Sequence, residues 1–480
     1  MTPTMPTAAD LLPLLPELVL VGAAFALLLL DLFLDQRRRV VTHVLAIAAL
    51  LVVAGLIAAG VGGQGTVLNG MFVRDTMADV LKIAACAITA LSLMYVWPFL
   101  RQRGLYQGEV AVLMLFAVAG MMLLISAGSL VMVYLGLELL ALCSYAMVAI
   151  DRDSPLGSEA AMKYFVLGSL ASGLLLYGMS LLYGATGTLD LAQLHAAVAG
   201  SAETTLLLMG TVFLVAGIAF KFGAAPFHMW LPDTYHGAPT AITVFIGSAP
   251  KLAAFAMAFR LLEAGLGPLD ERWRLLVAGL AVLSLVVGNV VALAQANLKR
   301  MLAYSTISHV GFLFLGLAAA DAAGYAAAMF YAISYAIMST AAFGAVVVLA
   351  SRGFEADRID DFKGLNARSP WLAGMMLIAM MSLAGIPPFL GFWAKLAVLR
   401  AALQGDMLWL AIVGIVFAVI GAYYYIRVVW YMYFADASDT TPLTAAADMR
   451  IVISANALGL LVLGLFPGGL LDLCARVLGG

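Results

Sequence analysis

The sequence contains a long succession of apolar runs of about 20 residues, separated by short polar breaks. This is the length that an α-helix needs to cross the hydrocarbon core of a bilayer. The chain is 64% hydrophobic and only 11% charged over 480 residues, whereas a soluble domain is about half apolar and about a quarter charged. We therefore predict an all-α, polytopic membrane helix bundle with about fourteen transmembrane helices.

The apolar runs also predict where each helix lies. They fall near residues 11–34, 40–60, 74–97, 109–127, 129–150, 157–184, 205–231, 239–264, 272–294, 301–319, 323–350, 369–403, 407–434 and 450–474. The longest polar stretches are residues 185–204, 351–368 and 435–449, and none is long enough to fold alone. Residues 1–480 are therefore expected to form a single transmembrane domain. The N-terminal stretch lacks the basic region of a cleaved signal, which favours a mature first helix.

Basic residues gather in alternate loops, which orients the bundle. If the N-terminus faces outward, the inward loops hold most of them, namely Arg37, Arg38, Arg39, Arg101, Arg103, Arg152, Lys299, Arg300, Arg352, Arg358, Lys363, Arg368 and Arg450. The outward loops hold few, namely Arg74, Arg272, Arg274 and Arg400. This asymmetry follows the positive-inside rule. An even number of helices then puts both termini outside.

Several functional classes are not supported by the sequence. Cys86, Cys143 and Cys474 are far apart and form no Cys-x-x-Cys or Cys/His pair, so we expect packing roles and no metal, haem or iron–sulfur ligation. No nucleotide-binding or nucleophile motif occurs, and no basic patch with interleaved aromatics indicates nucleic acid. The aromatic run at residues 423–433 is typical of an interfacial belt.

A short motif occurs twice, in expected helices 7 and 12. The segment GAAPF at residues 223–227 recurs as GIPPF at residues 385–389. Proline removes a helix hydrogen bond, so both helices are expected to be broken, with a mere kink as the alternative. Helix 12 lies an odd number of steps after helix 7, so the copies run in opposite directions, which is typical of inverted repeats. We expect helices 4–8 (about 109–264) and 9–13 (about 272–434) to be these repeats.

Four ionisable side chains lie deep inside apolar runs, namely Glu138, Lys221, Lys251 and Lys395. A charge at the bilayer centre costs about 2.5–3.5 kcal/mol on insertion scales, so such residues usually mark an ion or proton path. Lysine suits a relay because burial lets it release its proton, whereas arginine stays charged. We therefore predict that these residues transfer protons.

Glu138 lies about nine residues into its helix, or ~14 Å along the axis, which is close to the midplane. At ~7 Å and an effective dielectric of ~20, its carboxylate would attract the Lys221 ammonium by roughly 2.4 kcal/mol. Joining or separating the two groups would then change their proton affinity by tens-fold. We expect protons to pass from Lys221 by way of water and Lys251 toward Lys395. A static structural ion pair is the alternative.

Three further residues are weaker candidates. His309, inside expected helix 10, could bridge protons because histidine titrates near neutral pH, although a lone histidine is often a packed residue. His228 follows the first proline break. Lys163 lies near the inward end of helix 6, where lysine usually extends to the interface. Asp79 and Lys82 are spaced to neutralise each other on helix 3 and are expected to be structural.

Several longer strings resemble a known family. FKFGAAPFHMWLPDTYHGAPTAITVFIGSAPKLAAF resembles the helix 7–8 signature of the antiporter-like membrane subunits of respiratory complex I. EAAMKYFVLGSLASGLLLYG and NLKRMLAYSTISHVGFLFLG are most similar to subunit N of bacterial NADH–quinone oxidoreductase. The resemblance covers about residues 100–430, and the LPD…GAPT…PK pattern is specific. Mrp-type cation/proton antiporters and hydrogenase membrane subunits share the fold and charge layout.

The resemblance implies fourteen helices with inverted five-helix repeats, and a central proton-transfer row at Glu138, Lys221, Lys251 and Lys395. Lysine at position 395 agrees with subunit N rather than subunit M. It implies no cofactor on this chain, neither flavin, iron–sulfur cluster nor quinone site, so redox chemistry would occur on partner subunits. The implied location is the bacterial inner membrane, with protons and water as the transported species and other membrane subunits of complex I as partners.

Two alternatives stay open. A stand-alone cation/proton antiporter or an Mrp-complex subunit would differ by exchanging sodium for protons, which the purified chain can be tested for. A non-transporting scaffold bundle would leave proton flux unchanged when all four charged positions are neutralised.

Overall fold

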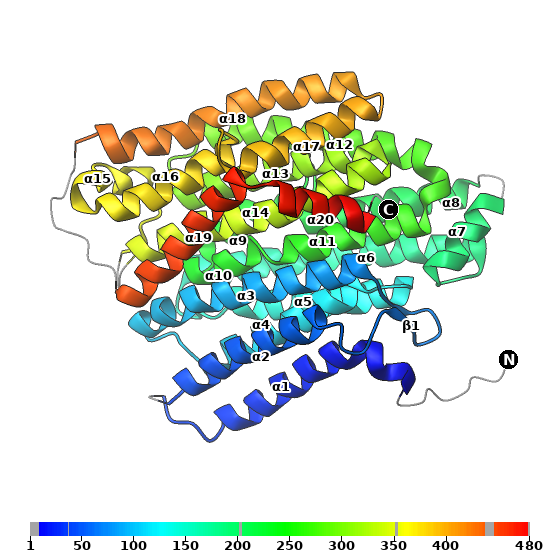
Figure 1. Cartoon of the computed structure of the whole chain (residues 1–480), viewed down its shortest axis with the longest axis horizontal. Coiled ribbons are helices and arrows are strands. Elements are labelled where there is room, and N and C mark those ends of the chain that lie inside the picture. Colours follow the sequence, from blue (N-terminus) through cyan, green and yellow to red (C-terminus); the bar gives the residue numbers. More distant parts are fainter. Residues whose placement is uncertain (1–8, 37, 201–203, 351–353, 437–445, 479–480) are drawn as a thin grey trace.

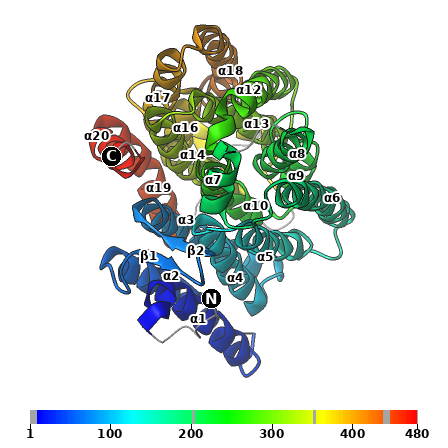
Figure 2. The same ribbon diagram turned by 90° about the vertical axis from the view of Figure 1, so that its right-hand side faces the viewer.

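The computed structural model is a bundle of long helices that run side by side along one axis (Figure 1). Figure 2 looks down this axis onto the helix ends. The structure describes residues 9–36, 38–200, 204–350, 354–436 and 446–478. The apolar segments form helices because lipid offers no partner for backbone polar groups, so each segment must satisfy its own.

The elements up to the first break in a membrane span are η1 (Ala9–Leu14), α1 (Leu15–Asp31), α2 (Val40–Ala58), β1 (Gly65–Val67), β2 (Phe72–Arg74), α3 (Thr76–Arg103), α4 (Gly108–Ile125), α5 (Leu130–Val148), α6 (Pro155–Thr186), α7 (Leu191–Gly200) and α8 (Thr205–Phe222). The elements after it are α9 (Trp230–Gly237), α10 (Thr240–Ile246), α11 (Pro250–Phe259), η2 (Arg260–Gly265), η3 (Gly267–Leu269), α12 (Asp270–Leu293), α13 (Leu298–Ala319), α14 (Ala322–Leu349), η4 (Ile359–Phe362), α15 (Leu365–Arg368), α16 (Pro370–Ala384), α17 (Leu390–Gln404), α18 (Leu408–Phe434), α19 (Ala447–Leu465) and α20 (Gly468–Leu478).

The number of spans agrees with the prediction. Among the described residues, 13 helical stretches are long and apolar enough to cross a membrane. The pair α16 and α17 makes the remaining span, which is split in two. The prediction of about fourteen membrane helices is therefore confirmed.

Helices 7 and 12 of the bundle are broken, as their prolines predicted. Residues 223–229 separate α8 from α9, and residues 385–389 separate α16 from α17. The first half of each ends at a left-handed glycine, Gly223 with φ 77° and Gly385 with φ 82°. Glycine occupies this conformation easily because it has no Cβ. The two breaks therefore begin with the same backbone turn.

Backbone groups freed at the first break find side-chain partners. The indole Nε1 of Trp230 donates to the carbonyl oxygen of Phe220 at 3.0 Å. The backbone N–H of Ala225 donates to Ser284 Oγ of α12 at 2.9 Å. These contacts stabilise the interrupted helix, because an unpaired backbone group inside the membrane costs several kcal/mol.

Some elements differ from the expectation. Expected helix 8 is also interrupted, since α10 ends at Ile246 and α11 begins at Pro250. A single helix over residues 450–474 is wrong, because Pro467 separates α19 from α20. The hairpin of β1 and β2, the short helix α7 and the loop helices η4 and α15 come in addition to the predicted spans.

One buried ion pair joins the first helix to the bundle. Lys82 on α3 is fully buried, and its Nζ lies 2.6 Å from Glu17 Oε1 on α1. Asp79 lies 2.8 Å from the Nε of Arg74 in the hairpin. The expected direct pairing of Asp79 with Lys82 is therefore wrong, because α1 supplies the carboxylate that contacts the lysine.

Candidate functional site

Lys221 lies in the last turn of α8 and lines a small cavity together with Tyr145, Tyr164 and Trp230. The volume within which the centre of a water molecule fits is about 20 Å³. A polar cavity needs about 10–15 Å³ of such volume to hold one water. The Glu138 carboxylate of α5 attracts Lys221 through space. Its Oε1 is buried without a hydrogen-bond partner among the described residues. Glu138 and Lys221 are thus coupled electrostatically without a direct contact.

Lys251 and Lys395 bind the two broken helices in the same way. Lys251 Nζ donates to the carbonyl oxygen of Phe222 at 2.6 Å, and Lys395 Nζ donates to that of Ala384 at 2.8 Å. Each acceptor is the last residue of a half-helix, α8 or α16. The C-terminal end of a helix carries partial negative charge and attracts a cation. Both lysines are buried, so the half-helix ends bind lysine side chains that are shielded from bulk solvent.

His309 on α13 is buried and hydrogen-bonded through both ring nitrogens. Its Nδ1 lies 2.6 Å from the hydroxyl of Tyr331, and its Nε2 lies 3.0 Å from the hydroxyl of Tyr425. Lys395 acts on His309 electrostatically. Because a hydroxyl can both donate and accept, the imidazole can exchange a proton on either side of the ring.

The aromatic run on α18 is only partly an interfacial belt. Tyr423 and Trp430 are 61% and 52% exposed, whereas Tyr424 and Tyr425 are each 1% exposed. The Tyr424 hydroxyl donates to Asn289 Oδ1 of α12 at 3.1 Å. The belt expectation is therefore wrong for these two tyrosines, because successive residues of a helix point in different directions and this pair faces the protein.

Lys163 and His228 lie apart from the buried row. Lys163 is 43% exposed and forms ion pairs with Glu159 at 2.7 Å and with Asp233 at 2.8 Å. His228 lies in the break of helix 7, and its Nδ1 is buried without a hydrogen-bond partner in the described part of the chain. Its ring centroid is 6.5 Å from that of Tyr304. The structure therefore places Lys163 in a surface network and His228 beside the first break.

Asp233 of α9 joins three helices at the end of the bundle that the loop charges predict to face inward. It accepts from Lys163 of α6 and from Arg300 Nη1 of α13, the latter at 2.7 Å. A cavity lies among these residues, Glu159 and His236, and the volume within which a water centre fits is about 50 Å³. The second half of broken helix 7 is thus fixed on its polar side and is open to water.

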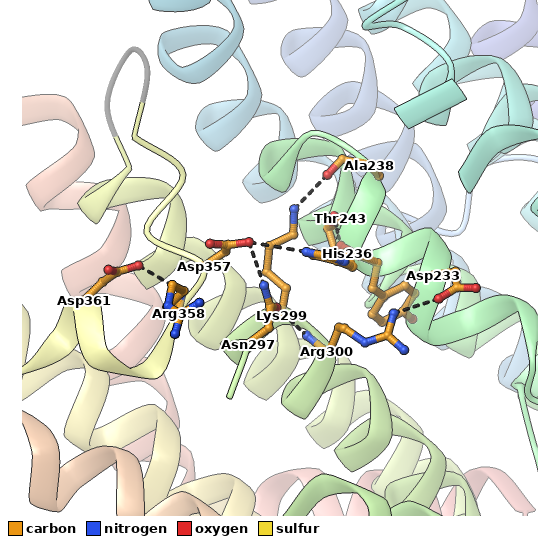
Figure 3. A network of polar contacts seen from close by, with 11 residues as sticks. Asp233, His236, Ala238, Thr243, Asn297, Lys299, Arg300, Asp357, Arg358 and Asp361 are labelled. Carbon is orange, nitrogen blue, oxygen red and sulfur yellow. Dashed lines mark hydrogen bonds and ion pairs between the residues drawn. The ribbon is translucent and has the colours of Figure 1, made fainter. Parts of the chain in front are cut away.

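A second group of contacts lies beside the first (Figure 3). Asp357, in the loop before η4, lies 3.4 Å from His236 Nε2 and accepts from Asn297 Nδ2 at 2.6 Å. Lys299 Nζ donates to the carbonyl oxygen of Ala238 at 2.9 Å. The hydrogen bond from His236 holds the pKa of the Asp357 carboxyl below its usual value, against the opposing effect of partial burial. These contacts tie the loop to α9 and α13.

The hydroxyl groups around His309 are not among the sequence candidates. Tyr425 is 116 residues away from His309 in the sequence, and Tyr331 is 22 residues away. Tyr331 and Tyr335 are spaced i, i+4 on α14, so they share one face of this largely apolar helix, and this spacing is the signal that could identify them. Among the residues that the structure describes, no group of three or more His, Cys, Asp or Glu is arranged to hold a metal ion.

Fold and site together define a class: multi-pass helical membrane proteins with two broken helices and a row of buried and half-buried ionisable side chains. The family described as NADH:quinone oxidoreductase/Mrp antiporter, TM matches residues 127–421. A curated relative from Xanthomonas euvesicatoria pv. vesicatoria (strain 85-10), NADH-quinone oxidoreductase subunit N, is 65% identical and covers 100% of this chain and 99% of its own length. The chain therefore belongs to the NADH-quinone oxidoreductase subunit N family.

Solved structures share the fold. A chain of respiratory complex I from Thermus thermophilus with bound Aureothin is 31% identical, with a TM-score of 0.81, and the match covers 95% of this chain and 98% of that one. A chain of the Mrp complex from Dietzia sp. DQ12-45-1b is 23% identical, with a TM-score of 0.83, and the match covers 98% of both chains. The second likeness shows the fold alone.

Proposed function

We propose that this chain is a proton-translocating membrane subunit of a bacterial NADH–quinone oxidoreductase. It lies in the inner membrane with other membrane subunits of complex I as partners, and redox chemistry takes place on other chains. The similarity of the chain, over its full length and at 65% identity, to a subunit N supports this function. Likeness to the Mrp complex is weaker, at 23% identity, so an antiporter function has less support.

We further assign proton transfer to Glu138, Lys221, Lys251, His309 and Lys395. The observation that carries this assignment is that the two buried lysines, Lys251 and Lys395, are each bound to the end of a broken membrane helix. Electrostatic coupling links neighbours along the row: Glu138 to Lys221, Lys221 to Lys251, and His309 to Lys395. A change of charge at one member therefore alters the proton affinity of the next.

The proposed sequence of steps starts at the Glu138 carboxylate. A signal from a neighbouring subunit moves Glu138 away from Lys221, which lowers the affinity of Lys221 for its proton. The small cavity beside Lys221 provides space for a water, and Lys251, whose Nζ lies 5.8 Å from the ring centroid of Trp230 in the cavity wall, receives the proton next. From Lys251 the proton reaches His309, and Lys395 releases it outward. Lys163 and His228 are not assigned to this row.

We also propose that helices 4–8 (about 109–264) and helices 9–13 (about 272–434) are inverted repeats. The two breaks support this proposal, because each begins with a left-handed glycine and each presents its last helical carbonyl to a lysine. Such pairing of broken helices at the midplane is typical of transporters built from two repeats.

Replacement of Lys221 tests the proposed function. We expect Lys221→Ala to lower NADH-driven proton pumping at least tenfold in inside-out membrane vesicles, while the complex still assembles. Lys221→Arg should also be impaired, because arginine does not release its proton. Lys363→Ala is the control, since this lysine lies in an inward loop and pairs with Asp360 at the surface. Normal pumping by Lys221→Ala would overturn the assignment.

A further inference from the structure

A column of buried polar side chains lies between the inward end of the bundle and His309. Lys299, Thr306 and His309 occur on α13 at spacings of seven and three residues, which places them on one side of the helix. Ten residues of helix correspond to ~15 Å, about half of the hydrocarbon core. All three side chains are buried, although the row proposed above uses only His309.

The upper part of the column is a chain of hydroxyl groups. The Tyr335 hydroxyl of α14 donates to Thr306 Oγ1 at 2.7 Å, and the Tyr335 ring centroid lies 5.0 Å from that of His309. The Tyr235 hydroxyl of α9 lies close enough to Thr306 to influence it, and it donates to the carbonyl oxygen of Ile246 at 3.5 Å. Three helices thus bring hydroxyl groups together directly below the imidazole.

The lower part of the column begins at the water-facing network of Figure 3. Lys299 is only 3% exposed, whereas the side chain of its neighbour Asp357 is 28% exposed. Asp357 and Glu355 both act on Lys299 electrostatically. Lys299 is therefore a buried cation directly behind carboxylates that face the inward solution.

Unpaired hydroxyl groups lie between the two parts. Thr234 on α9 and Thr240 on α10 are fully buried, and in the described part of the chain neither hydroxyl has a hydrogen-bond partner. A buried hydroxyl is normally satisfied by protein or by ordered water. Thr234 and Thr240 are therefore the positions where internal water would connect Lys299 with Thr306.

We propose that this column is the access route by which protons from the inward solution reach His309. One proton binds at the Asp357 carboxylate, Lys299 accepts it while releasing the proton that it holds, and the hydroxyl groups of Thr306 and Tyr335 carry that proton to His309. Each hydroxyl accepts one proton and gives up another, so no charge remains on the column after a transfer. The inference rests on the proposed row, and it adds an inward opening that joins the row at its second half.

Removal of single hydroxyl groups tests the route in the intact complex. We expect Thr306→Val and Tyr335→Phe each to lower the rate of NADH-driven pumping at least threefold in inside-out vesicles. The solvent deuterium isotope effect on that rate should rise, because proton access becomes limiting. Thr306→Ser keeps the hydroxyl and should restore pumping. Thr211→Val is the matched control, because buried Thr211 on α8 donates to its i−4 carbonyl at 2.9 Å, as Thr306 does.

Lys221→Ala, measured in parallel, separates failure of the route from failure of the proposed function. Normal pumping by Thr306→Val and Tyr335→Phe, with pumping lost in Lys221→Ala, would overturn the route and leave the row intact. Equal losses in Thr306→Ser and Thr306→Val would also overturn it, because packing rather than the hydroxyl would then be responsible. Normal pumping by Lys221→Ala would overturn the proposed function itself.

Discussion

At the scale of single residues, the proposed proton carriers differ from the structural charges in the kind of partner they have. Lys251 and Lys395 are bound by backbone carbonyls, and His309 is bound by hydroxyl groups. Such neutral partners satisfy hydrogen bonds without fixing the charge of the side chain. Lys82 instead contacts the Glu17 carboxylate at 2.6 Å, which stabilises its charged form. The partner type therefore indicates which buried groups can exchange protons.

Removal of one hydroxyl beside His309 should slow pumping. Tyr425→Phe deletes the partner of Nε2 and leaves a buried ring nitrogen unpaired, which costs about 1–3 kcal/mol. We expect a several-fold lower rate of NADH-driven pumping in vesicles, with normal assembly. Tyr423→Phe, two positions away but 61% exposed, should pump like the unaltered protein. Equal rates in the two variants would contradict the role of Tyr425.

At the scale of secondary-structure elements, the two breaks determine where the lysines lie. Gly385 has φ 82°, and a Cβ added there would lie 2.7 Å from Lys395 Cδ. Gly223 has φ 77°, and a Cβ there would lie 2.4 Å from a side-chain carbon of Leu231. Left-handed backbone costs a residue with a Cβ about 1–2 kcal/mol. Both glycines are therefore required by the turn and by the close approach of a neighbour.

Substitution at the second break should displace its lysine. We expect Gly385→Ala to push Lys395 away from the Ala384 carbonyl and to lower pumping several-fold, because the added methyl group and Lys395 occupy the same space. Gly374→Ala is the control on the same half-helix, α16, since nothing lies within 4 Å of its added Cβ. Pumping rates of the two variants, measured at equal subunit content, check this expectation. A loss in Gly374→Ala alone would refute it.

The loop before η4 should loosen in acid. Asp357 faces His236, Asn297 and Lys299, and the hydrogen bond from His236 lowers its pKa. A carboxyl with a lowered pKa stabilises the fold above its unfolded pKa, and this contribution is lost as pH falls through the lowered folded value. Amide hydrogen exchange of residues 354–362, corrected for intrinsic rates, should therefore accelerate below pH about 4. In Asp357→Asn we expect fast exchange already at neutral pH, without this acid transition.

Element positions could largely be predicted from the sequence, and contacts could not. Apolar length predicted the spans because only helices satisfy the backbone in lipid, and the prolines at 226 and 388 marked the breaks. The boundary between α19 and α20 was missed although Pro467 and the two glycines that follow it are a signal for a helix break. The partners of His309 come from distant segments and depend on helix packing. In the sequence Lys299 is indistinguishable from an ordinary loop charge, because its burial depends on the packing of the segment at the end of α9 against it.

At the scale of the whole molecule, helix α14 forms the centre and α1 the edge. α14 contacts α3, α10, α13, α16, α17 and α19. Helices α1 and α2 lie at one side of the bundle when it is seen down its axis (Figure 2). Glu17 and Lys82 join this outer helix to α3. The attachment of α1 therefore depends on a charge pair as well as on apolar packing.

Neutralisation of Glu17 should destabilise this attachment. Glu17→Gln leaves Lys82 as a buried charge without its carboxylate, and breaking a buried pair from one side costs about 3–5 kcal/mol. We expect a lower thermal unfolding temperature of the purified complex and easier proteolysis of the loop between α1 and α2. Glu109→Gln is the control, because Glu109 is exposed at the start of α4. An unchanged unfolding temperature in Glu17→Gln would contradict this account.

Lys251 and Lys395 each donate to the last carbonyl of a half-helix, so we expect the protonation of either lysine to affect how firmly that helix end is held. When the proton leaves, the charge attraction between the lysine and the negative helix terminus is lost, so the lysine holds the helix end less firmly. We expect a passing proton to be accompanied by a small displacement of the end of α8 or α16. A neighbouring subunit that contacts these helix ends would then respond to proton transfer through backbone movement alone.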